Sequence, residues 1–184
     1  MARNESMEKN FMSIAKIGKL MPSILVVYYS FEGNTKFIAE TIASAVDADT
    51  LRLEVKKELK SHGFSKFVWG GRQVVMKSKP ALKLPMEKNP ADYDILFIGT
   101  PVWAYTFSPA LRTFFANVKL VNKKIALFCS CGGTRKKTFE NMRAQLQGNE
   151  ILGEFQAIEP LHQDSEAQTQ NAIDWAKEMV SSLG

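Results

Sequence analysis

Residues 24–35 read ILVVYYSFEGNT, an apolar run that leads directly into a loop rich in polar residues. The run at 24–29 carries no charged residue on either face, which is typical of a strand buried on both sides. Such strands lie at the centre of parallel sheets that are covered by helices. The stretch therefore predicts an α/β fold with a polar loop at the carboxyl end of its first strand.

Strand-like runs and stretches of helical periodicity then alternate to the end of the chain. Consecutive parallel strands are usually neighbours and their crossovers are right-handed, so five strands fit the order 2-1-3-4-5. The predicted fold is a doubly wound α/β domain with a five-stranded parallel sheet. The further strands are expected at 50–55, 94–100, 123–130 and 151–160, and the helical apolar positions lie at 37–45, 110–115, 139–146 and 165–183.

One domain is expected over residues 23–184, preceded by a leader at 1–22 that is a short helix or a disordered arm. The segment at 56–89 is longer than a crossover requires. Apolar residues at 64–75 predict a helix within it, and Pro80, Pro85 and Pro90 predict an extended approach to the third strand. A helix followed by a surface loop is the simpler interpretation, and a binding lid is the alternative.

Composition excludes several classes of protein. The chain has 184 residues, 45% of them hydrophobic, and a net charge of +5, which is too small a charge density for a nucleic-acid-coating protein. No apolar run approaches the roughly 20 residues of a membrane span. The only cysteines, Cys129 and Cys131, offer no disulfide framework, so a cytoplasmic protein is expected.

The ligand of a doubly wound sheet lies beyond the carboxyl ends of its strands, where the strand order reverses. After the first strand, Ser30, Gly33, Asn34 and Thr35 combine hydroxyls with backbone N–H groups at a helix start, which suits a phosphate. The loop matches neither the dinucleotide-binding nor the P-loop motif. An ordinary turn with Asn34 or Thr35 as the helix cap is the alternative interpretation.

The loop after the third strand carries three aromatic residues, Trp103, Tyr105 and Phe107, which suit a flat aromatic ligand. Alternatively, Trp103 and Phe107 pack beneath the next helix. After the fourth strand, the adjacent glycines Gly132 and Gly133 let the backbone approach a ligand closely.

Cys131 precedes these glycines in the same loop. We interpret it as a small loop residue rather than a reactive thiol, because no histidine lies nearby in the sequence and the start of the next helix is the only evident activating group.

These three loops, each at the end of its strand, resemble the FMN-binding loops of flavodoxins. The resemblance covers residue 24 to the C-terminus, and it is most specific at Ser30 and at Gly33, Asn34 and Thr35. It implies that FMN is the cofactor and that these four residues hold its phosphate. Phe31 and Glu32 depart from the pattern, because the family usually has small residues there.

For the isoalloxazine ring, the resemblance implies two sets of contacts. One side would be lined from the loop after the third strand, with Trp103 as the stacking aromatic, and the pyrimidine edge would meet the loop after the fourth strand. The residues concerned are Thr100, Pro101, Val102 and Trp103, followed by Ser130, Cys131, Gly132 and Gly133.

The function implied is electron transfer by bound FMN, with redox proteins or a nicotinamide-linked reductase as partners. No catalytic acid or base and no metal ligands are predicted. The alternative is an FMN-dependent NAD(P)H:quinone or flavin oxidoreductase on the same fold, and a third possibility is a binding module without flavin. Basic residues concentrate at 51–90 and acidic residues at 150–184. Either these are ordinary solvated faces, or the polarity steers a partner to one side of the flavin.

Overall fold

The computed structural model describes residues 22–56 and 78–182 of the chain. Two expectations therefore lie outside the described residues: the leader, except for its last residue, and the helix expected around 64–75. No helix in the described ranges is long and apolar enough to cross a membrane. The first strand begins shortly after the domain boundary that the sequence predicts at residue 23.

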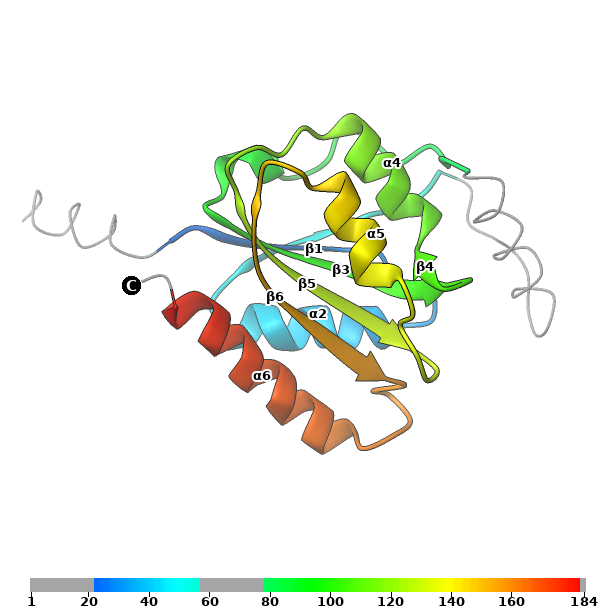
Figure 1. The fold of residues 1–184 in the computed structure, drawn as a ribbon, viewed down its shortest axis with the longest axis vertical. Coiled ribbons are helices and arrows are strands. Elements are labelled where there is room, and N and C mark those ends of the chain that lie inside the picture. Colours follow the sequence, from blue (N-terminus) through cyan, green and yellow to red (C-terminus); the bar gives the residue numbers. More distant parts are fainter. Residues whose placement is uncertain (1–21, 57–77, 183–184) are drawn as a thin grey trace, which may run out of the picture.

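Five parallel strands form the central sheet (Figure 1). Their order across the sheet, β2-β1-β3-β5-β6, confirms the order predicted for five parallel strands. The first and third predicted strands, which correspond to β1 and β3, are neighbours in the sheet as expected. The strands are β1 (Ile24–Tyr28), β2 (Asp49–Arg52), β3 (Ile95–Trp103), β5 (Lys124–Cys131) and β6 (Glu150–Ile158).

Two of the described helices cover each face of the sheet (Figure 1). On one face, α2 (Asn34–Ala45) and α6 (Ser165–Ser181) pack against the strands. On the other face lie α4 (Pro109–Asn117) and α5 (Thr138–Gln145). Each helix contributes one apolar stripe to a core, so the two layers enclose the sheet as a doubly wound fold requires.

The central strands are buried on both faces, as the run at 24–29 predicts. Gly99 on β3 and Phe128 on β5 are packed closely in the core. A Cβ atom at Gly99 would fall 2.0 Å from the ring of Phe128, so that ring occupies the place of the missing side chain. Burial of a phenylalanine side chain contributes about 1.5–3 kcal/mol to stability.

The register brings the carboxyl ends of the strands together at one edge. Pro101 on β3 pairs with Ser130 on β5, and Cys131 pairs with Ile158 on β6. Because every strand of the central five runs in the same direction, the segments that follow β1, β3, β5 and β6 all emerge at this edge.

A β-hairpin replaces the loop predicted after the third strand. β3 continues to Trp103, and the two-residue strand β4 (Thr106–Phe107) returns antiparallel beside it. Ala104 and Tyr105 form the turn with φ values of 44° and 68°. Two positive φ angles are typical of the type I′ turn that joins closely paired strands. This turn is not evident from the sequence, because neither residue is the Asn or Gly that such turns favour.

Three other boundaries differ from prediction. β2 ends at Arg52, and Val55 makes only an isolated bridge to Leu82. Pro90 opens a short 3-10 helix, η1 (Pro90–Asp92), because a proline fits the first position of a helix, where no N–H bond is needed. The helix cap predicted at Asn34 or Thr35 is instead Gly33, whose φ of 97° favours glycine.

Candidate functional site

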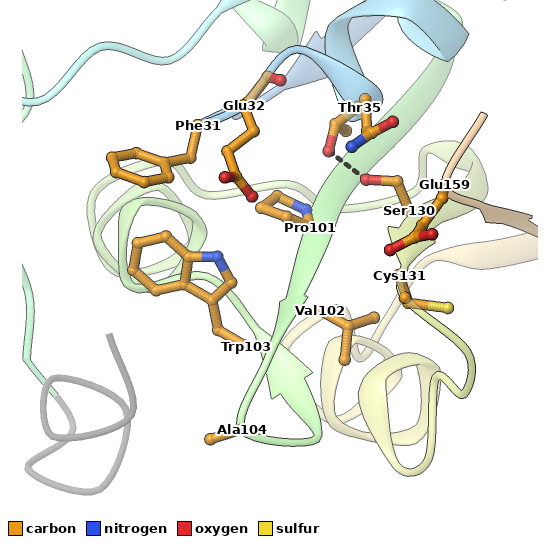
Figure 2. A pocket seen from close by; sticks show the side chains of 13 residues that line it. Phe31, Glu32, Thr35, Pro101, Val102, Trp103, Ala104, Ser130, Cys131 and Glu159 are labelled. Atoms are coloured by element: carbon orange, nitrogen blue, oxygen red, sulfur yellow. Dashed lines mark hydrogen bonds between the residues drawn. The ribbon is translucent and has the colours of Figure 1, made fainter. Parts of the chain in front are cut away.

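A cleft of about 220 Å³ opens at the carboxyl ends of the central strands, between the segments that follow β1, β3, β5 and β6 (Figure 2). It lies where the strand order reverses, since β1 and β3 are neighbours in the sheet but β1 is followed in sequence by β2. The sheet topology therefore places the cleft at the position predicted for the ligand. Thirteen residues line it: Ser30, Phe31, Glu32, Asn34, Thr35, Pro101, Val102, Trp103, Ala104, Ser130, Cys131, Gly132 and Glu159.

The start of α2 forms one wall of the cleft. The backbone N–H groups of the first turn have no acceptor within the helix, and no side chain caps it. Gly33 turns the chain into the helix, and its N–H donates to the Ser30 hydroxyl at 3.2 Å. A helix start with open N–H groups and a neighbouring hydroxyl is suited to an anion such as a phosphate.

A buried hydroxyl pair joins this wall to the end of β5. Thr35 Oγ1 and Ser130 Oγ lie 2.7 Å apart and share a hydrogen bond (Figure 2). Both residues are almost fully buried. The start of α2 and the end of β5, which are far apart in the sequence, are thus held together at the floor of the cleft.

The hairpin provides the aromatic wall. Trp103 lies at the end of β3, and its ring meets the rings of Tyr29 and Phe31 nearly at right angles. Phe107 is buried and packs against Phe115 on α4, whereas Trp103 lines the cleft. The packing interpretation therefore holds for Phe107, which belongs to the core, whereas Trp103 lines the cleft and its contact with a ligand stays a prediction.

The loop after β5 is held by a side chain from β6. Gln156 Nε2 donates to Cys131 Sγ at 3.3 Å and to the Gly133 carbonyl oxygen at 3.2 Å. Burial raises the pKa of the Cys131 thiol, while hydrogen bonds from Gly133 and Gln156 oppose the shift. The thiol is therefore less ionised than a free cysteine at neutral pH, which agrees with its interpretation as a small loop residue.

A fourth segment, directly after β6, was missed by sequence reasoning. Glu159 lines the cleft, and the Leu161 N–H donates to Asn34 Oδ1 at 3.2 Å. Leu161 also lies against Gly33, where a Cβ atom would be 3.2 Å from Leu161 Cδ1. The rule that ligands lie beyond the carboxyl ends of strands could have pointed to this segment, because β6 ends at the same edge.

Carboxylates are the only charged side chains that line the cleft in the described part of the chain. Glu32 comes from the loop after β1 and is exposed, while Glu159 is half-buried beside the Ser130 loop (Figure 2). Arg52 does not line the cleft, but its Nη2 donates to the carbonyl oxygen of the lining residue Ser30 at 3.4 Å. Any anion that enters the cleft must therefore be bound chiefly by N–H and hydroxyl donors.

Most residues predicted for the site line the cleft, but three do not. Thr100 is fully buried and braces the hairpin, because its Oγ1 accepts from the Ser108 N–H at 3.0 Å. Gly33 shapes the turn before α2, and Gly133 lies outside the lining. The structure brings together Ser30, Asn34, Thr35, Pro101, Val102, Trp103, Ser130, Cys131 and Gly132, and it adds Phe31, Glu32, Ala104 and Glu159.

A family model described as flavodoxin matches residues 23–155 of the chain. The chain belongs to the flavodoxin family. The match includes β1, β3 and β5, with the loops that follow them, and thus three of the four segments around the cleft. Among curated proteins, no sequence relative of this flavodoxin is found.

Solved structures share its fold at low sequence identity. A flavoprotein from Lactobacillus acidophilus in complex with FMN is 24% identical, with a TM-score of 0.64, over 82% of this flavodoxin and 99% of that chain. Oxidised flavodoxin 2 from Bacillus cereus is 17% identical, with a TM-score of 0.55, over 87% and 99%. The two-electron-reduced flavodoxin of Megasphaera elsdenii is 20% identical, with a TM-score of 0.54, over 83% and 97%.

Proposed function

We propose that this flavodoxin binds FMN non-covalently in the cleft and carries electrons between redox partners. One observation carries the proposal: the uncapped start of α2 and the indole of Trp103 line the same cleft. An anion site next to an aromatic wall suits a ligand with a phosphate tail and a flat ring system. The FMN complex of the Lactobacillus acidophilus flavoprotein supports the same cofactor.

The donors of the cleft fit a phosphate. The first turn of α2 offers backbone N–H groups, and the hydroxyls of Ser30 and Thr35 lie beside it. No positive side chain is needed in such a site, because the helix start carries partial positive charge. We therefore assign the phosphate to Ser30, Asn34 and Thr35, with Gly33 shaping the turn that exposes the N–H groups.

The opposite wall fits a ring system. Trp103 supplies the flat aromatic surface, while Pro101 and Val102 line the cleft beside it. Ser130, Cys131 and Gly132 offer backbone groups and small side chains along another edge. Thr100 is fully buried, and the Gly133 carbonyl oxygen accepts from Gln156 outside the lining, so we assign them to the support of the hairpin and of the β5 loop.

When bound, FMN supplies the redox chemistry, and the protein orients the flavin and adjusts its environment. In the described residues, nothing in the cleft lining resembles a proton donor other than two carboxylates and one thiol. An electron carrier needs no such donor, and the experiment with NADPH and NADH below separates it from an oxidoreductase. Cytoplasmic location fits the two free cysteines, as thiols persist in a reducing compartment.

A titration of the apoprotein tests the cofactor. FMN fluorescence should be quenched on binding, and riboflavin, which lacks the phosphate, should bind much more weakly. Equal affinity for both ligands would contradict the phosphate assignment, and absence of binding would overturn the function.

Anaerobic mixing of the FMN-loaded protein with NADPH or NADH distinguishes an electron carrier from an oxidoreductase. A carrier should remain oxidised unless a reductase is added. Rapid bleaching of the flavin absorbance by either nucleotide alone would instead establish the alternative, an FMN-dependent NAD(P)H:quinone or flavin oxidoreductase.

A further inference from the structure

Exposed apolar side chains gather around the mouth of the cleft. Tyr105 is 63% exposed at the tip of the hairpin, next to the lining residue Ala104. Ile158 and Leu161 are 37% and 41% exposed on either side of the lining residue Glu159. Such a grouping around a functional site is typical of a surface that another macromolecule covers.

Three consecutive basic residues lie beside the tip of the hairpin. The amine of Lys136 is 5.9 Å from the centre of the Tyr105 ring. Lys137 is also exposed, and within the described ranges neither lysine pairs with a carboxylate. Arg135 alone has an acidic neighbour, at 3.6 Å from Glu140. We call this surface the basic rim; it consists of Tyr105, Arg135, Lys136 and Lys137.

Arg135 stabilises α5, because it pairs with Glu140 and lies 4.9 Å from the centre of the Phe139 ring, but among the described residues no such contact with α5 explains Lys136 and Lys137. The three residues immediately precede the helix, and Lys137 is its N-cap without a side-chain capping bond. The start of a helix carries partial positive charge, so cations there are unfavourable by a few tenths of a kcal/mol. A charge that costs stability where it stands is better explained by an interaction with something else.

Charge also indicates the kind of partner. Inside the cleft the charged lining residues are both carboxylates, Glu32 and Glu159. The rim outside has the opposite sign and is combined with exposed apolar side chains. This arrangement suits a protein that covers the mouth and places acidic residues on the rim.

We propose that the basic rim docks an acidic face of the redox protein with which this flavodoxin exchanges electrons. The inference rests on the proposed function. In each productive encounter one electron passes from the reduced flavin to the partner, for example to a ferric haem, which becomes ferrous. Docking on the rim places the partner beside the hairpin wall of the cleft, so charge pairing there accelerates the encounter.

The test uses FMN-loaded protein, reduced with dithionite, and ferric cytochrome b5 as an acidic probe. Stopped-flow rates should fall steeply as ionic strength rises. Lys136→Glu combined with Lys137→Glu should slow the reaction about tenfold or more at low salt and flatten its salt dependence. Toward cytochrome c, a basic haem protein, the same variant should react faster than the parent.

Lys119→Glu combined with Lys177→Glu is the matched control. It changes the net charge equally, but Lys119 precedes β5 and Lys177 lies near the end of α6, so both are at the opposite edge of the sheet. If this control slows the reaction as much as the rim variant, net charge rather than the rim governs docking and the inference is wrong.

The inference and the proposed function fail in different ways. Failure of the apoprotein to bind FMN would overturn both. Normal FMN binding, with electron transfer to cytochrome b5 that neither the rim variant nor salt alters, would overturn the docking surface alone. A visible spectrum equal to that of the parent will show that the rim variant is folded and loaded.

Discussion

The rings of Phe31 and Trp103 meet edge-on, with centroids 5.8 Å apart and planes at 89°. Tyr29 approaches the same indole at 6.1 Å and 84°. Two nearly perpendicular neighbours restrict the rotation of the indole, and each such aromatic contact contributes about 0.5–1.5 kcal/mol beyond burial. The aromatic wall of the cleft is therefore set in place before any ligand arrives.

Trp103→Ala should weaken FMN binding by about 1–3 kcal/mol, the range found for stacking of nucleic-acid bases on aromatic side chains. Fluorescence titration of the apoprotein measures the Kd. Tyr105→Asn is the control, since Tyr105 is exposed on the rim and Asn tolerates its positive φ. An unchanged Kd in Trp103→Ala would remove Trp103 from the binding site.

Phe31→Leu should weaken FMN binding about 2- to 10-fold, less than loss of the indole itself, because Leu keeps apolar volume but not the edge-on contact. Phe31→Tyr, which keeps the aromatic ring and its edge-on contact, should bind FMN with the affinity of the parent protein. In a Trp103→Ala background the Phe31 substitution should have no further effect, since its role is to orient the indole. Additive losses in this double-mutant cycle would show that Phe31 acts independently of Trp103.

The sequence was sufficient for the fold because burial on both faces of β1, β3 and β5 leaves a clear pattern of apolar runs. It was insufficient at the hairpin, where the positive φ angles of Ala104 and Tyr105 have no residue signature. The family resemblance placed Thr100 in the site, but β3 continues beyond Thr100 and its hydroxyl braces the hairpin instead of lining the cleft. Glu159 belongs to no motif and reaches the cleft only through the length and register of β6.

Thr35→Val should destabilise the apoprotein by about 1–3 kcal/mol. The substitution preserves shape but leaves the buried Ser130 hydroxyl without its partner at 2.7 Å. Thr35→Ser, which keeps the hydroxyl, should cost distinctly less. Urea denaturation of the apoproteins measures both, and equal midpoints for the two variants would show that the hydroxyl pair does not stabilise the cleft floor.

Alkylation of Cys131 should be slower at pH 7 than that of glutathione and should accelerate at higher pH. Burial raises the pKa of its thiol, so a smaller fraction is thiolate, the reactive form, at any given pH. Gln156→Leu should slow the reaction further, because the Gln156 N–H bond to Cys131 Sγ favours the thiolate. Iodoacetamide labelling followed by peptide mass spectrometry measures the rate at Cys131, and labelling as fast as that of glutathione would contradict the pKa shift.

Glu159→Gln should tighten FMN binding, because the carboxylate lines a cleft in which we place a phosphate. Gln keeps the size of the side chain and its capacity to accept from Gln163 Nε2. With screening close to that of water, removal of one charge should increase the affinity by roughly 2- to 5-fold, or about 0.4–1 kcal/mol. The gain should shrink at high salt.

Riboflavin is the matched ligand for this substitution, because it keeps the ring system and lacks the phosphate. Its affinity should be the same for Glu159→Gln and for the parent protein. An equal gain for riboflavin and FMN would mean that Glu159 acts on the ring or on the backbone at its φ of 42°, and not on the phosphate charge. A difference confined to FMN places the phosphate within the electrostatic reach of the segment after β6, the part of the cleft that no sequence motif revealed.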